Sequence, residues 1–560
     1  MMKLADPAQL TLRGDLAERV RRAICHLREL DSEVMWQELE DPNEMWHWGA
    51  DYPGRWLGTM ALLSRHTGED YGVRRVAKRL IGYQQADGGF HPFSSPIDYK
   101  EWFGMGRGLV GLMDYHAATG DQEALDAAGR LCGFYAEQYP EFGPYMYECY
   151  SNGLEGLVAL AYLTGDPRAL QMAHLVAERS MAFQQVWQST TVSPQGRRSP
   201  CGGQVHCQIT TARGLLDLCE LSGDQRYLES VLALHDYISR NTLSIAGGVG
   251  FYFNRPEENE ACADADWLRL NLQLWRLTGE MRFLDFAEQT LTNQIPFVQA
   301  SNGAFCYLRG LQNRSGAAFD VCCSHHAPRA LWEVMRYAVT AEPGLLSVNL
   351  FLDAATAMSV GDGDERITLT STVRIEPETF TVDLDLALAS PARFAVRIRV
   401  PAWANGDALS IDGQAVTPGG QPGAIVVERT WNDGARITVR FQIRARIVRG
   451  YRIGEYLVDA EKAAVMHGPR LFCLSDQHNP TVPQHLVRLR AGRNGRGAIS
   501  IENPDRLTAS GTGPNGTMLP VVFTPISATG GNPNGIGRSH PALASPFRVW
   551  VPIEEDGDGP

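Results

Sequence analysis

The sequence lacks several features that would tie it to a membrane, to nucleic acid or to export. It has no run of about 18 apolar residues, so we expect no membrane-spanning helix. It also has no Lys/Arg-rich run, and its formal net charge is −13, which argues against nucleic acid and anionic membrane surfaces as partners. The first 18 residues carry charges throughout and contain no signal-peptide core, so the 11 cysteines predict reduced thiols in a cytoplasmic protein.

The chain has an ordinary globular composition, with 44% hydrophobic and 21% charged residues, and it contains a short repeated phrase. The phrase is a Thr or Ser followed by Gly and an acidic residue, and it occurs at 67–69, 119–121, 164–166, 222–224 and 278–280. Apolar runs with a helical period flank the copies, such as 154–163 and 169–181. Because Gly can close one helix in a left-handed cap and an acidic residue can start the next, each unit predicts a helical hairpin.

The number of these units predicts the architecture of residues 1–345. Five units of about 50 residues, with part of a sixth at 330–340, are typical of an (α/α)6 toroid, a closed ring of helical hairpins. An open solenoid is the alternative. Closure is favoured because no polar capping repeat is evident and a different kind of domain follows directly. The loops at one end of such a ring form a mouth, where we expect ligands to bind.

The hydrophobic period changes near residue 345, from helical to alternating. Alternating segments such as 367–373 and 394–400, separated by Gly-rich turns, predict a β-sandwich over 346–450. A second β-rich region is expected over 451–560, with loop at 509–540 and an acidic tail. The fold class is therefore a multidomain α + β protein, with a toroid followed by β-sandwich domains. No motif with evident chemistry lies in the β part.

The densest group of chemically reactive residues is Cys322-Cys323-Ser324-His325-His326, just before Pro328. Proline fits the first turn of a helix, so the two cysteines should lie just ahead of a helix N-terminus. The positive end of the helix dipole favours thiolate over thiol there, and a thiolate is both a nucleophile and a metal ligand. The alternative is a pair of buried structural thiols.

A second group stands one hairpin earlier, at Glu260 and Cys262. Residues two apart share one face only in an extended segment, so this should be a loop just before a helix over 267–277. That loop and the Cys-Cys pair should lie at the same end of the toroid, because both precede an inward helix. A carboxylate and three thiolates brought together make a plausible four-coordinate zinc site. Its ligands would be Glu260, Cys262, Cys322 and Cys323.

These two motifs resemble those of glycoside hydrolase family 127, the β-L-arabinofuranosidases. In that family a Glu-x-Cys motif precedes one helix and a Cys-Cys-Pro-Pro-Asn motif precedes the next, and here they stand at 260–262 and 322–326. The segments 397–403 and 464–470 also match the family's pattern, and the resemblance covers roughly residues 45–475. The last three positions of the second motif differ in this chain.

The resemblance implies a zinc-dependent retaining exo-glycosidase that hydrolyses a furanoside within a small carbohydrate or glycoconjugate. Cys322 would be the nucleophile, forming a covalent thioglycosyl intermediate, and zinc on the four ligands would keep it ionised. The family's general acid is a Glu in a long loop after a Gly-Gly-x-Gly turn. Here the turn is 247–250 and the shorter loop contains only Glu257 and Glu258, of which Glu257 is nearer the family's offset. The alternative is that both are solvated loop acids.

Other candidate residues would bind the sugar. Asp51 resembles a family position that holds sugar hydroxyls, and His206 lies near a substrate-binding His of the family. At 101–102 the family's Glu is kept and its His is replaced, and at 325–326 two histidines replace Pro-Asn. The candidate substrate-binding residues are therefore Asp51, Glu101, Trp102, His206, His325 and His326. The alternatives are a structural role for the histidine and core packing for the tryptophan.

Two other functions remain open at this point. Toroids of this kind host several activities, so a sugar epimerase or isomerase could use His206, His325 or His326 as bases. A non-catalytic protein that binds zinc or carbohydrate is the third hypothesis, since the acid loop is short and the Cys-Cys motif is altered. Sandwich domains in such chains offer dimer surfaces, so a homodimer is one option for the assembly.

Overall fold

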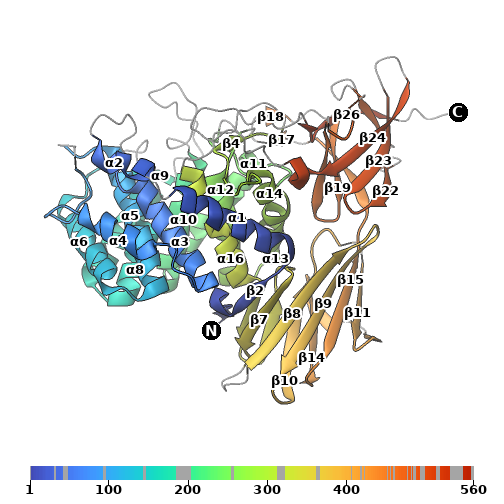
Figure 1. The fold of residues 1–560 in the computed structure, drawn as a ribbon, viewed down its shortest axis with the longest axis horizontal. Helices are drawn as coiled ribbons and strands as arrows, with labels where there is room; N and C mark the ends of the chain where they lie inside the picture. The colour runs from blue at the N-terminus through green and yellow to red at the C-terminus, as the bar shows by residue number, and fades with distance from the viewer. Residues whose placement is uncertain are drawn as a thin grey trace.

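The chain folds into a helical toroid, a β-sandwich and a further β-sheet (Figure 1). The computed structural model describes residues 2–30, 33–41, 48–92, 96–142, 147–184, 204–253, 258–311, 322–360, 366–404, 406–416, 419–421, 423–450, 452–453, 456–457, 461–475, 477–480, 482, 487–491, 499–512, 517–529 and 547–555. None of the described helices is long and apolar enough to cross a membrane.

Six helices form the inner ring of the toroid. They are α3 (Asp51–Thr67), α5 (Tyr99–Thr119), α8 (Leu154–Thr164), α10 (Val205–Ser222), α12 (Ala261–Thr278) and α16 (Arg329–Tyr337). Each helix contacts the next, and α16 contacts α3, so the ring is closed and the predicted toroid is confirmed. Most of their residues are buried, as expected for helices that are covered on all sides.

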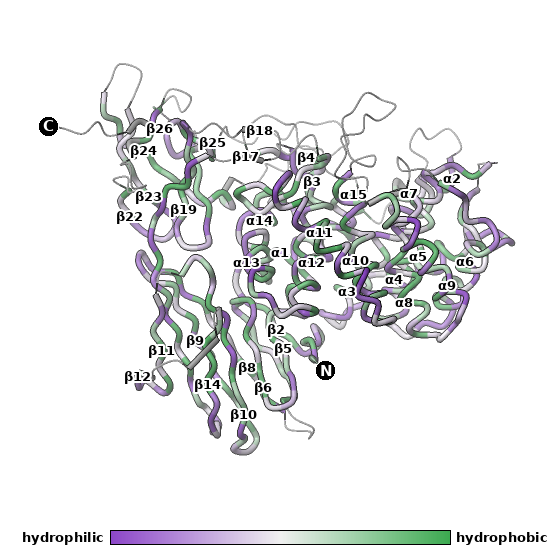
Figure 2. The backbone as a smooth tube through the Cα atoms, turned by 180° about the vertical axis from the view of Figure 1, so that it is seen from behind, coloured by the Kyte–Doolittle hydropathy of each residue, from purple (hydrophilic) through white to green (hydrophobic). Residues whose placement is uncertain are grey.

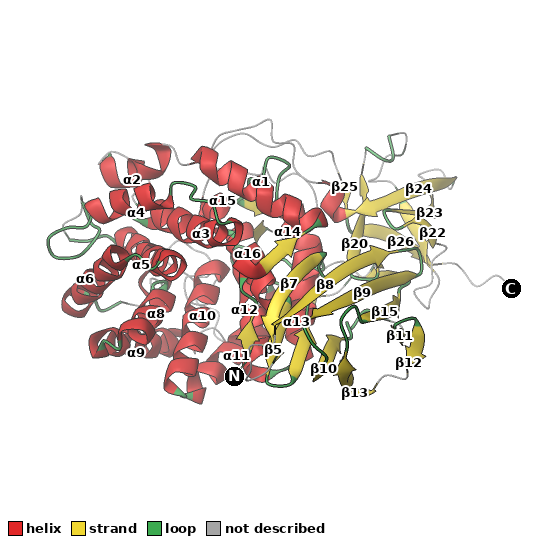
Figure 3. Cartoon of the chain, turned by 60° about the horizontal axis from the view of Figure 1, so that its bottom comes forward, coloured by secondary structure: helices red, strands yellow, loops and turns green. Residues whose placement is uncertain are grey.

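The outer helices pack against this ring (Figure 3), and each buries part of its surface there. They are α1 (Gly14–Leu30), α4 (Val73–Gly82), α6 (Gln122–Gln138), α9 (Pro167–Gln184), α11 (Gln225–Asn241) and α13 (Met281–Gln289). Shorter helices are η1 (Pro7–Gln9), η2 (Glu33–Trp36), α2 (Gln37–Glu40), α7 (Tyr147–Ser151), the π-helix η5 (Thr290–Gln294), α14 (Ile295–Val298) and η7 (Ile526–Thr529).

The repeated phrase has the structural role that its composition predicts. Its five glycines, Gly68, Gly120, Gly165, Gly223 and Gly279, each cap an inner helix in the left-handed conformation, with φ between 66° and 77°. The side chains of Asp121 and Asp224 then accept backbone N–H groups at the start of the next outer helix. Five of the six inner helices therefore end just before the next outer helix begins, and the sixth, α16, leads into β5 (Val339–Glu342).

Two glycines bring α3 and α5 unusually close together. A Cβ atom on Gly111 would lie 2.2 Å from the carbonyl oxygen of Gly54, and a Cβ on Gly54 would lie 2.6 Å from that of Arg107. Only residues without a side chain allow this approach. As a result, Arg55 of α3 and Arg107 of α5 lie next to each other inside the ring.

The β-sandwich consists of two sheets (Figure 2), and burial alternates along strands such as Arg366–Ile375 and Ala392–Arg399. The six-stranded sheet has the order β1 (Lys3–Leu4), β5 (Val339–Glu342), β6 (Leu345–Val348), β10 (Ala392–Arg399), β14 (Ala424–Trp431), β13 (Gly419–Gln421). The seven-stranded sheet has the order β12 (Gln414–Val416), β11 (Asp407–Ile411), β15 (Arg436–Gln442), β9 (Thr379–Leu388), β8 (Arg366–Ile375), β7 (Ala354–Ser359), β2 (Leu10–Leu12). The first strands of the chain thus belong to the sandwich, one in each sheet.

The region after residue 445 forms a nine-stranded sheet. Its order is β16 (Ala445–Arg449), β19 (Lys462–His467), β26 (Val551–Glu555), β21 (Arg488–Ala491), β23 (Arg506–Thr512), β24 (Met518–Pro525), β20 (Arg470–Ser475), β25 (Phe547–Arg548), and β22 (Ile499–Asn503) pairs with β23. A two-stranded ribbon, β17 (Arg452–Ile453) and β18 (Tyr456–Leu457), lies apart from it. The predicted loop over 509–540 is wrong at the end of β23, at β24 and at η7. Pairing of β24 with β23 and β20 buries Val521 and Phe523 despite the surrounding Gly and Pro.

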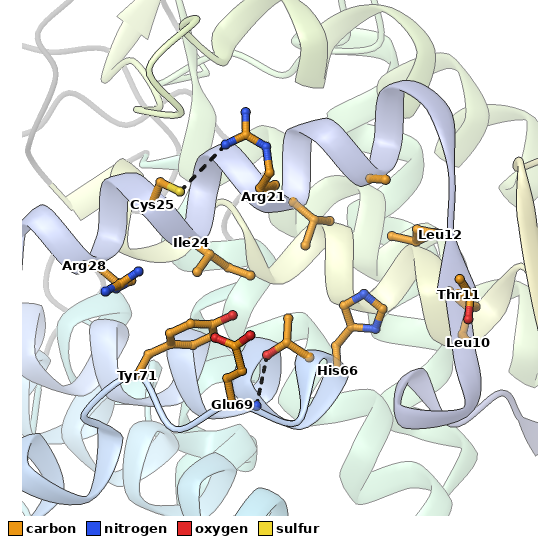
Figure 4. Close-up of a pocket in the computed structure, with 13 residues that line it drawn as sticks. Leu10, Thr11, Leu12, Arg21, Ile24, Cys25, Arg28, His66, Glu69 and Tyr71 are labelled. Carbon is orange, nitrogen blue, oxygen red and sulfur yellow. Dashed lines mark hydrogen bonds between the residues drawn. The ribbon is translucent and has the colours of Figure 1, made fainter.

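A pocket of about 360 Å³ lies between α1 and the C-terminal part of α3, on the outside of the ring (Figure 4). It is lined by Leu10, Thr11, Leu12, Ala17, Val20, Arg21, Ile24, Cys25, Arg28, His66, Thr67, Glu69 and Tyr71. None of the residues that the sequence predicts for the functional site lines this pocket, so it is separate from that site.

A buried arginine joins the sandwich to the toroid. Arg399 of β10 is 1% exposed, and it donates to Asp285 Oδ1 at 2.8 Å and to Glu288 Oε1 at 2.5 Å, both on α13. Its Nε also donates to the carbonyl oxygen of Asn349 at 2.8 Å. Trp403 donates to the second oxygen of Glu288 at 2.6 Å. This cluster fixes the position of the sandwich on the outer helix.

We therefore expect Arg399→Met to destabilise the protein strongly. The variant leaves two carboxylates without their cation, and breaking a buried pair in this way costs about 3–5 kcal/mol. The control is Arg393→Met on the same strand, whose side chain is 71% exposed and pairs with Glu428, and which should cost less than about 1 kcal/mol. Denaturant unfolding followed by fluorescence measures both, and equal shifts in midpoint would contradict this account of the joint.

Candidate metal centre and active site

The predicted ligands converge at the mouth of the toroid. The Sγ atom of Cys262 lies 3.2 Å from that of Cys323 and 3.9 Å from that of Cys322, and the last two are 4.0 Å apart. Glu260 Oε1 lies 4.0 Å from the Cys323 sulfur. One ligand atom from each of the four residues lies within 4.8 Å of all the others.

The local structure around these ligands differs from the prediction. Helix α12 begins at Ala261, so Cys262 lies in its first turn and not in a preceding loop. Glu260 is extended and belongs to β3 (Asn259–Glu260), which pairs with β4 (Leu308–Arg309). The cysteine pair opens a separate five-residue helix, α15 (Cys322–His326), ahead of α16. The change from strand to helix at residue 260 is what directs Glu260 and Cys262 to the same point.

The donor set and its spacing suit a tetrahedral metal ion. Two sulfurs bound to one tetrahedral zinc lie about 3.8 Å apart, since each Zn–S bond is about 2.3 Å. The three observed sulfur–sulfur distances, 3.2, 3.9 and 4.0 Å, scatter around that value. Glu260, Cys262 and Cys323 are 0% exposed, so a carboxylate and two thiolates buried side by side would have Arg55 as their nearest cation and would gain from a bound metal ion.

The three cysteines have different acidities. Hydrogen bonds from the thiols of Cys262 and Cys323, together with the nearby Arg55 guanidinium, lower the pKa of Cys322 well below its usual value. Burial raises the pKa of Cys262 and of Cys323. Burial, and then the negative charge of Cys322, raise the pKa of Glu260. Cys322 is also the only one of the four ligand residues that is partly exposed.

A layer of buried polar side chains lies beneath the cluster. Arg55 donates to Asp51 Oδ1 at 2.5 Å and to Cys262 Sγ at 3.7 Å, and its Nη1 lies 3.3 Å from His206 Nε2. Arg107 approaches the same His206 nitrogen, at 3.4 Å. A guanidinium can only donate, so His206 Nε2 must be unprotonated and the neutral ring carries its proton on Nδ1.

Asp266 is the centre of this layer. One of its oxygens lies 3.1 Å from His206 Nδ1 and 2.9 Å from His326 Nε2, and the other accepts Arg269 at 2.5 Å. These three residues, His206, Asp266 and His326, are a second set that could reach one metal ion. However, Nδ1 of His206 carries a proton, and three guanidinium groups surround the set. We therefore interpret it as a hydrogen-bonded assembly.

The other predicted site residues lie in different surroundings. Asp51 is buried beside Arg55, and the ring of His325 stacks on Tyr52 with centroids 5.0 Å apart. Glu101 instead caps its own helix, because its Oε2 accepts the N–H of Asp98 at 3.2 Å. Trp102 is 3% exposed and packs against the aromatic rings of α6, so it belongs to the core.

Of the two candidate acids, only Glu258 is among the described residues. Glu257 lies outside the described residues. Glu258 is half-buried, and its carbonyl oxygen accepts the N–H of Phe251 at 2.7 Å, which fixes the backbone just before β3.

The sequence did not predict several residues of the site. Arg55 follows Asp51 by four positions, a helical spacing that could have signalled the pair, whereas Arg107 and Asp266 have no local signal. Tyr307 is half-buried next to β4, and burial and the charges of Glu260 and the cluster cysteines raise its pKa. Gln204, just before α10, donates to Glu260 Oε2 at 3.4 Å.

Comparison with known proteins agrees with this architecture. A family model described as the beta-L-arabinofuranosidase GH127 catalytic domain matches residues 43–334, and a model of the GH127 middle domain matches 345–443. The chain is therefore a glycoside hydrolase. It belongs to glycoside hydrolase family 127, the family that the two motifs resemble.

Individual relatives are distant but cover most of the chain. A non-reducing end beta-L-arabinofuranosidase of Bifidobacterium longum is 20% identical over 450 residues, covering 69% of this chain and 67% of that protein. A solved GH127 beta-arabinofuranosidase is 17% identical with a TM-score of 0.77, over 99% of this chain and 98% of its own. A GH127 beta-L-arabinofuranosidase from Geobacillus stearothermophilus T6 is 16% identical with a TM-score of 0.75, over 97% of this chain and 100% of its own. At this identity the two structures support the fold.

The state of His206 makes the stability of the protein sensitive to acid. Burial, and then the charges of Arg107 and Arg55, lower its pKa from 6.5 to about 4, although Asp266 opposes the shift. Between pH 6.5 and pH 4 the unfolded chain therefore binds a proton at His206 that the folded chain does not bind. The contribution of His206 to the free energy of unfolding is fully present above pH 6.5 and is lost as the pH falls toward 4. The loss from this one residue is on the order of 3 kcal/mol.

The variant His206→Gln should remove that part of the loss, because glutamine can accept from the arginines and donate to Asp266 without titrating. Unfolding midpoints measured from pH 8 to pH 5 should fall less steeply in the variant than in the wild type. Above pH 7 the difference between the two proteins should not vary with pH. Parallel curves over the whole range would show that His206 is not held neutral.

Proposed function

We propose that the protein is a zinc-dependent retaining exo-glycosidase that hydrolyses a furanoside, such as a β-L-arabinofuranoside or a related five-carbon sugar. The observation that carries this proposal is the convergence of Glu260, Cys262, Cys322 and Cys323 on one point. The printed names of the relatives, which are arabinofuranosidases, support the choice of sugar. A small carbohydrate or glycoconjugate is the substrate that this reaction requires.

Cys322 is the proposed nucleophile because it is the partly exposed sulfur and its pKa is lowered. Its Sγ attacks the anomeric carbon as the bond to the leaving oxygen breaks, which gives a thioglycosyl enzyme. Water then attacks the anomeric carbon from the face opposite the sulfur, the face that the leaving oxygen occupied, as the carbon–sulfur bond breaks. The two inversions together retain the configuration. When bound by the four ligands, zinc would supply the positive charge that keeps the thiols and Glu260 ionised.

The leaving oxygen needs a proton, and the loop before β3 is the proposed source. Glu257 and Glu258 are the acids of that loop, and Glu258 lies two residues before the ligand Glu260. After the first step the same carboxylate would take a proton from the attacking water, as in other retaining glycosidases. Of the two, Glu257 is the proposed acid, because it is nearer the family's offset from the Gly-Gly-x-Gly turn.

The buried layer supports cleavage of a terminal sugar. Arg213 pairs with Glu155 at 2.6 Å and Arg329 pairs with Asp114, deeper along the inner helices than the cluster. Arg213, Glu155 and Arg329 are buried and Asp114 is half-buried, which supports a floor that closes the ring beneath the site. A site with such a floor would accommodate one end of a sugar chain. Asp51 and His325 are the proposed partners of its hydroxyl groups, because both ring nitrogens of His206 already face protein groups.

An epimerase or isomerase, whose bases would be His206, His325 or His326, is less well supported. The Nε2 lone pair of His206 faces two guanidinium groups, and the pKa of His206 is lowered to about 4, chiefly by burial. His326 faces Asp266 through Nε2, and burial lowers its pKa as well. A histidine held neutral in this way is a weak proton acceptor.

The cytoplasmic location and a homodimer stay predictions of the sequence.

The most direct variant is Cys322→Ser. Serine keeps the size of the side chain but loses the thiolate, so hydrolysis of 4-nitrophenyl β-L-arabinofuranoside should fall by at least about 10³-fold, while circular dichroism stays unchanged. The control Cys132→Ser changes a buried cysteine of α6 outside the cluster and should keep most of the activity. Turnover by Cys322→Ser at the wild-type rate would rule out the thiolate mechanism.

A further inference from the structure

One arginine connects the sulfur cluster to the polar layer beneath it. Arg55 is 2% exposed, and its guanidinium reaches Asp51, His206 and Cys262 at the same time. The donors of a guanidinium lie in one plane at fixed angles, so one side chain sets the positions of all three partners. The ring of Phe103, 5.6 Å from the guanidinium carbon, supports it from another side.

The three sulfurs differ in whether a cation donates to them. In the described part of the chain, Cys262 accepts an N–H from Arg55 at 3.7 Å, whereas Cys322 and Cys323 have only each other, Cys262 and Glu260 as close partners. A hydrogen bond from a cation draws electron density away from a thiolate and makes it a weaker nucleophile. Cys323 is fully buried, so Cys322 is the sulfur that is both accessible and without such a donor.

We propose that Arg55 is a positioning residue of the metal cluster, which holds Cys262 in place as a ligand and leaves Cys322 as the reactive thiolate. The assignment of Cys322 as nucleophile rests on the proposed function, but the action of Arg55 on the cluster does not. The asymmetry explains how a centre with three thiolates directs its reactivity to one of them. Partners of this kind, which contact a ligand and not the metal, orient the ligand and tune its electron density.

Arg107 provides a matched control for this role. It is also a buried guanidinium, 2% exposed, next to the same His206 nitrogen and the same Phe103 ring. Among the described residues it contacts none of the three sulfurs. A change at Arg107 therefore disturbs the polar layer to a similar degree without removing a donor from the cluster.

The experiment uses the full-length protein loaded with cobalt(II), which absorbs through charge transfer from bound thiolates. In Arg55→Met the charge-transfer band should move to longer wavelength, because a thiolate without its N–H donor is more easily oxidised. Zinc affinity, measured by competition with a chelator, should fall about 10- to 100-fold. Arg55→Lys, which keeps the charge but loses the planar donors, should recover only part of the affinity. Arg107→Met should leave the band where it is.

Several results would overturn the inference. An unchanged band and unchanged zinc affinity in Arg55→Met would do so, as would an equal band shift in Arg107→Met. If Arg55→Met does not fold, the same charge-transfer band and zinc affinity are measured in Arg55→Lys. A band position and a zinc affinity equal to those of the wild type in that variant would overturn the inference. Failure of the proposed function is separable: a band shift in the variant, with no furanoside hydrolysis by the wild type, supports the role of Arg55 and contradicts the proposed furanosidase activity.

Discussion

The main constraint on this structure is the burial of three ionisable side chains beside a partly exposed fourth, with ligand atoms within 4.8 Å of one another. Ionised together they would repel strongly, and burial raises the pKa of Glu260, Cys262 and Cys323. A bound divalent cation would replace that mutual repulsion with four attractive contacts. The other features of the site serve to stabilise these four side chains. Arg55 donates to Cys262, buried charges of opposite sign lie beneath the cluster, and only Cys322 is partly exposed.

The toroid supplies the rigidity that such a group needs. Asp51, His206, Cys262 and Cys322 all lie in the first turns of their helices, so the mouth of the ring collects them from four separate elements. The close approach of α3 and α5 at Gly54 and Gly111 then places two guanidiniums side by side beneath the sulfurs. The sandwich and the last sheet carry none of the predicted ligands, and the sandwich is fastened to the outside of the ring through Arg399.

The periodic parts of the fold could be predicted from the sequence, because local rules determine them. A left-handed cap requires Gly, so the repeated phrase located five hairpin junctions, and alternation located the sandwich strands. The four metal ligands were predictable from Cys and Glu spacing combined with the family motifs. Strand β24 was missed, because its pairing partners rather than its own composition make it a strand.

The buried layer could not be predicted, because its partners are far apart in the chain. Arg107 and His206 are separated by about a hundred residues, and the hydrogen-bond network of Asp266 depends on how the helices pack in the ring. For the same reason the roles expected of Glu101 and Trp102 did not follow from sequence position, since a capping bond and an aromatic core determine where those side chains point.

The measurement that tests the central claim most directly is X-ray absorption at the zinc edge on the zinc-loaded protein. This account predicts one tightly bound zinc with three sulfur neighbours at about 2.3 Å and one oxygen at about 2.0–2.2 Å. A spectrum dominated by nitrogen and oxygen, which would place the metal at His206, Asp266 and His326, would contradict it. So would a protein that binds no zinc at all.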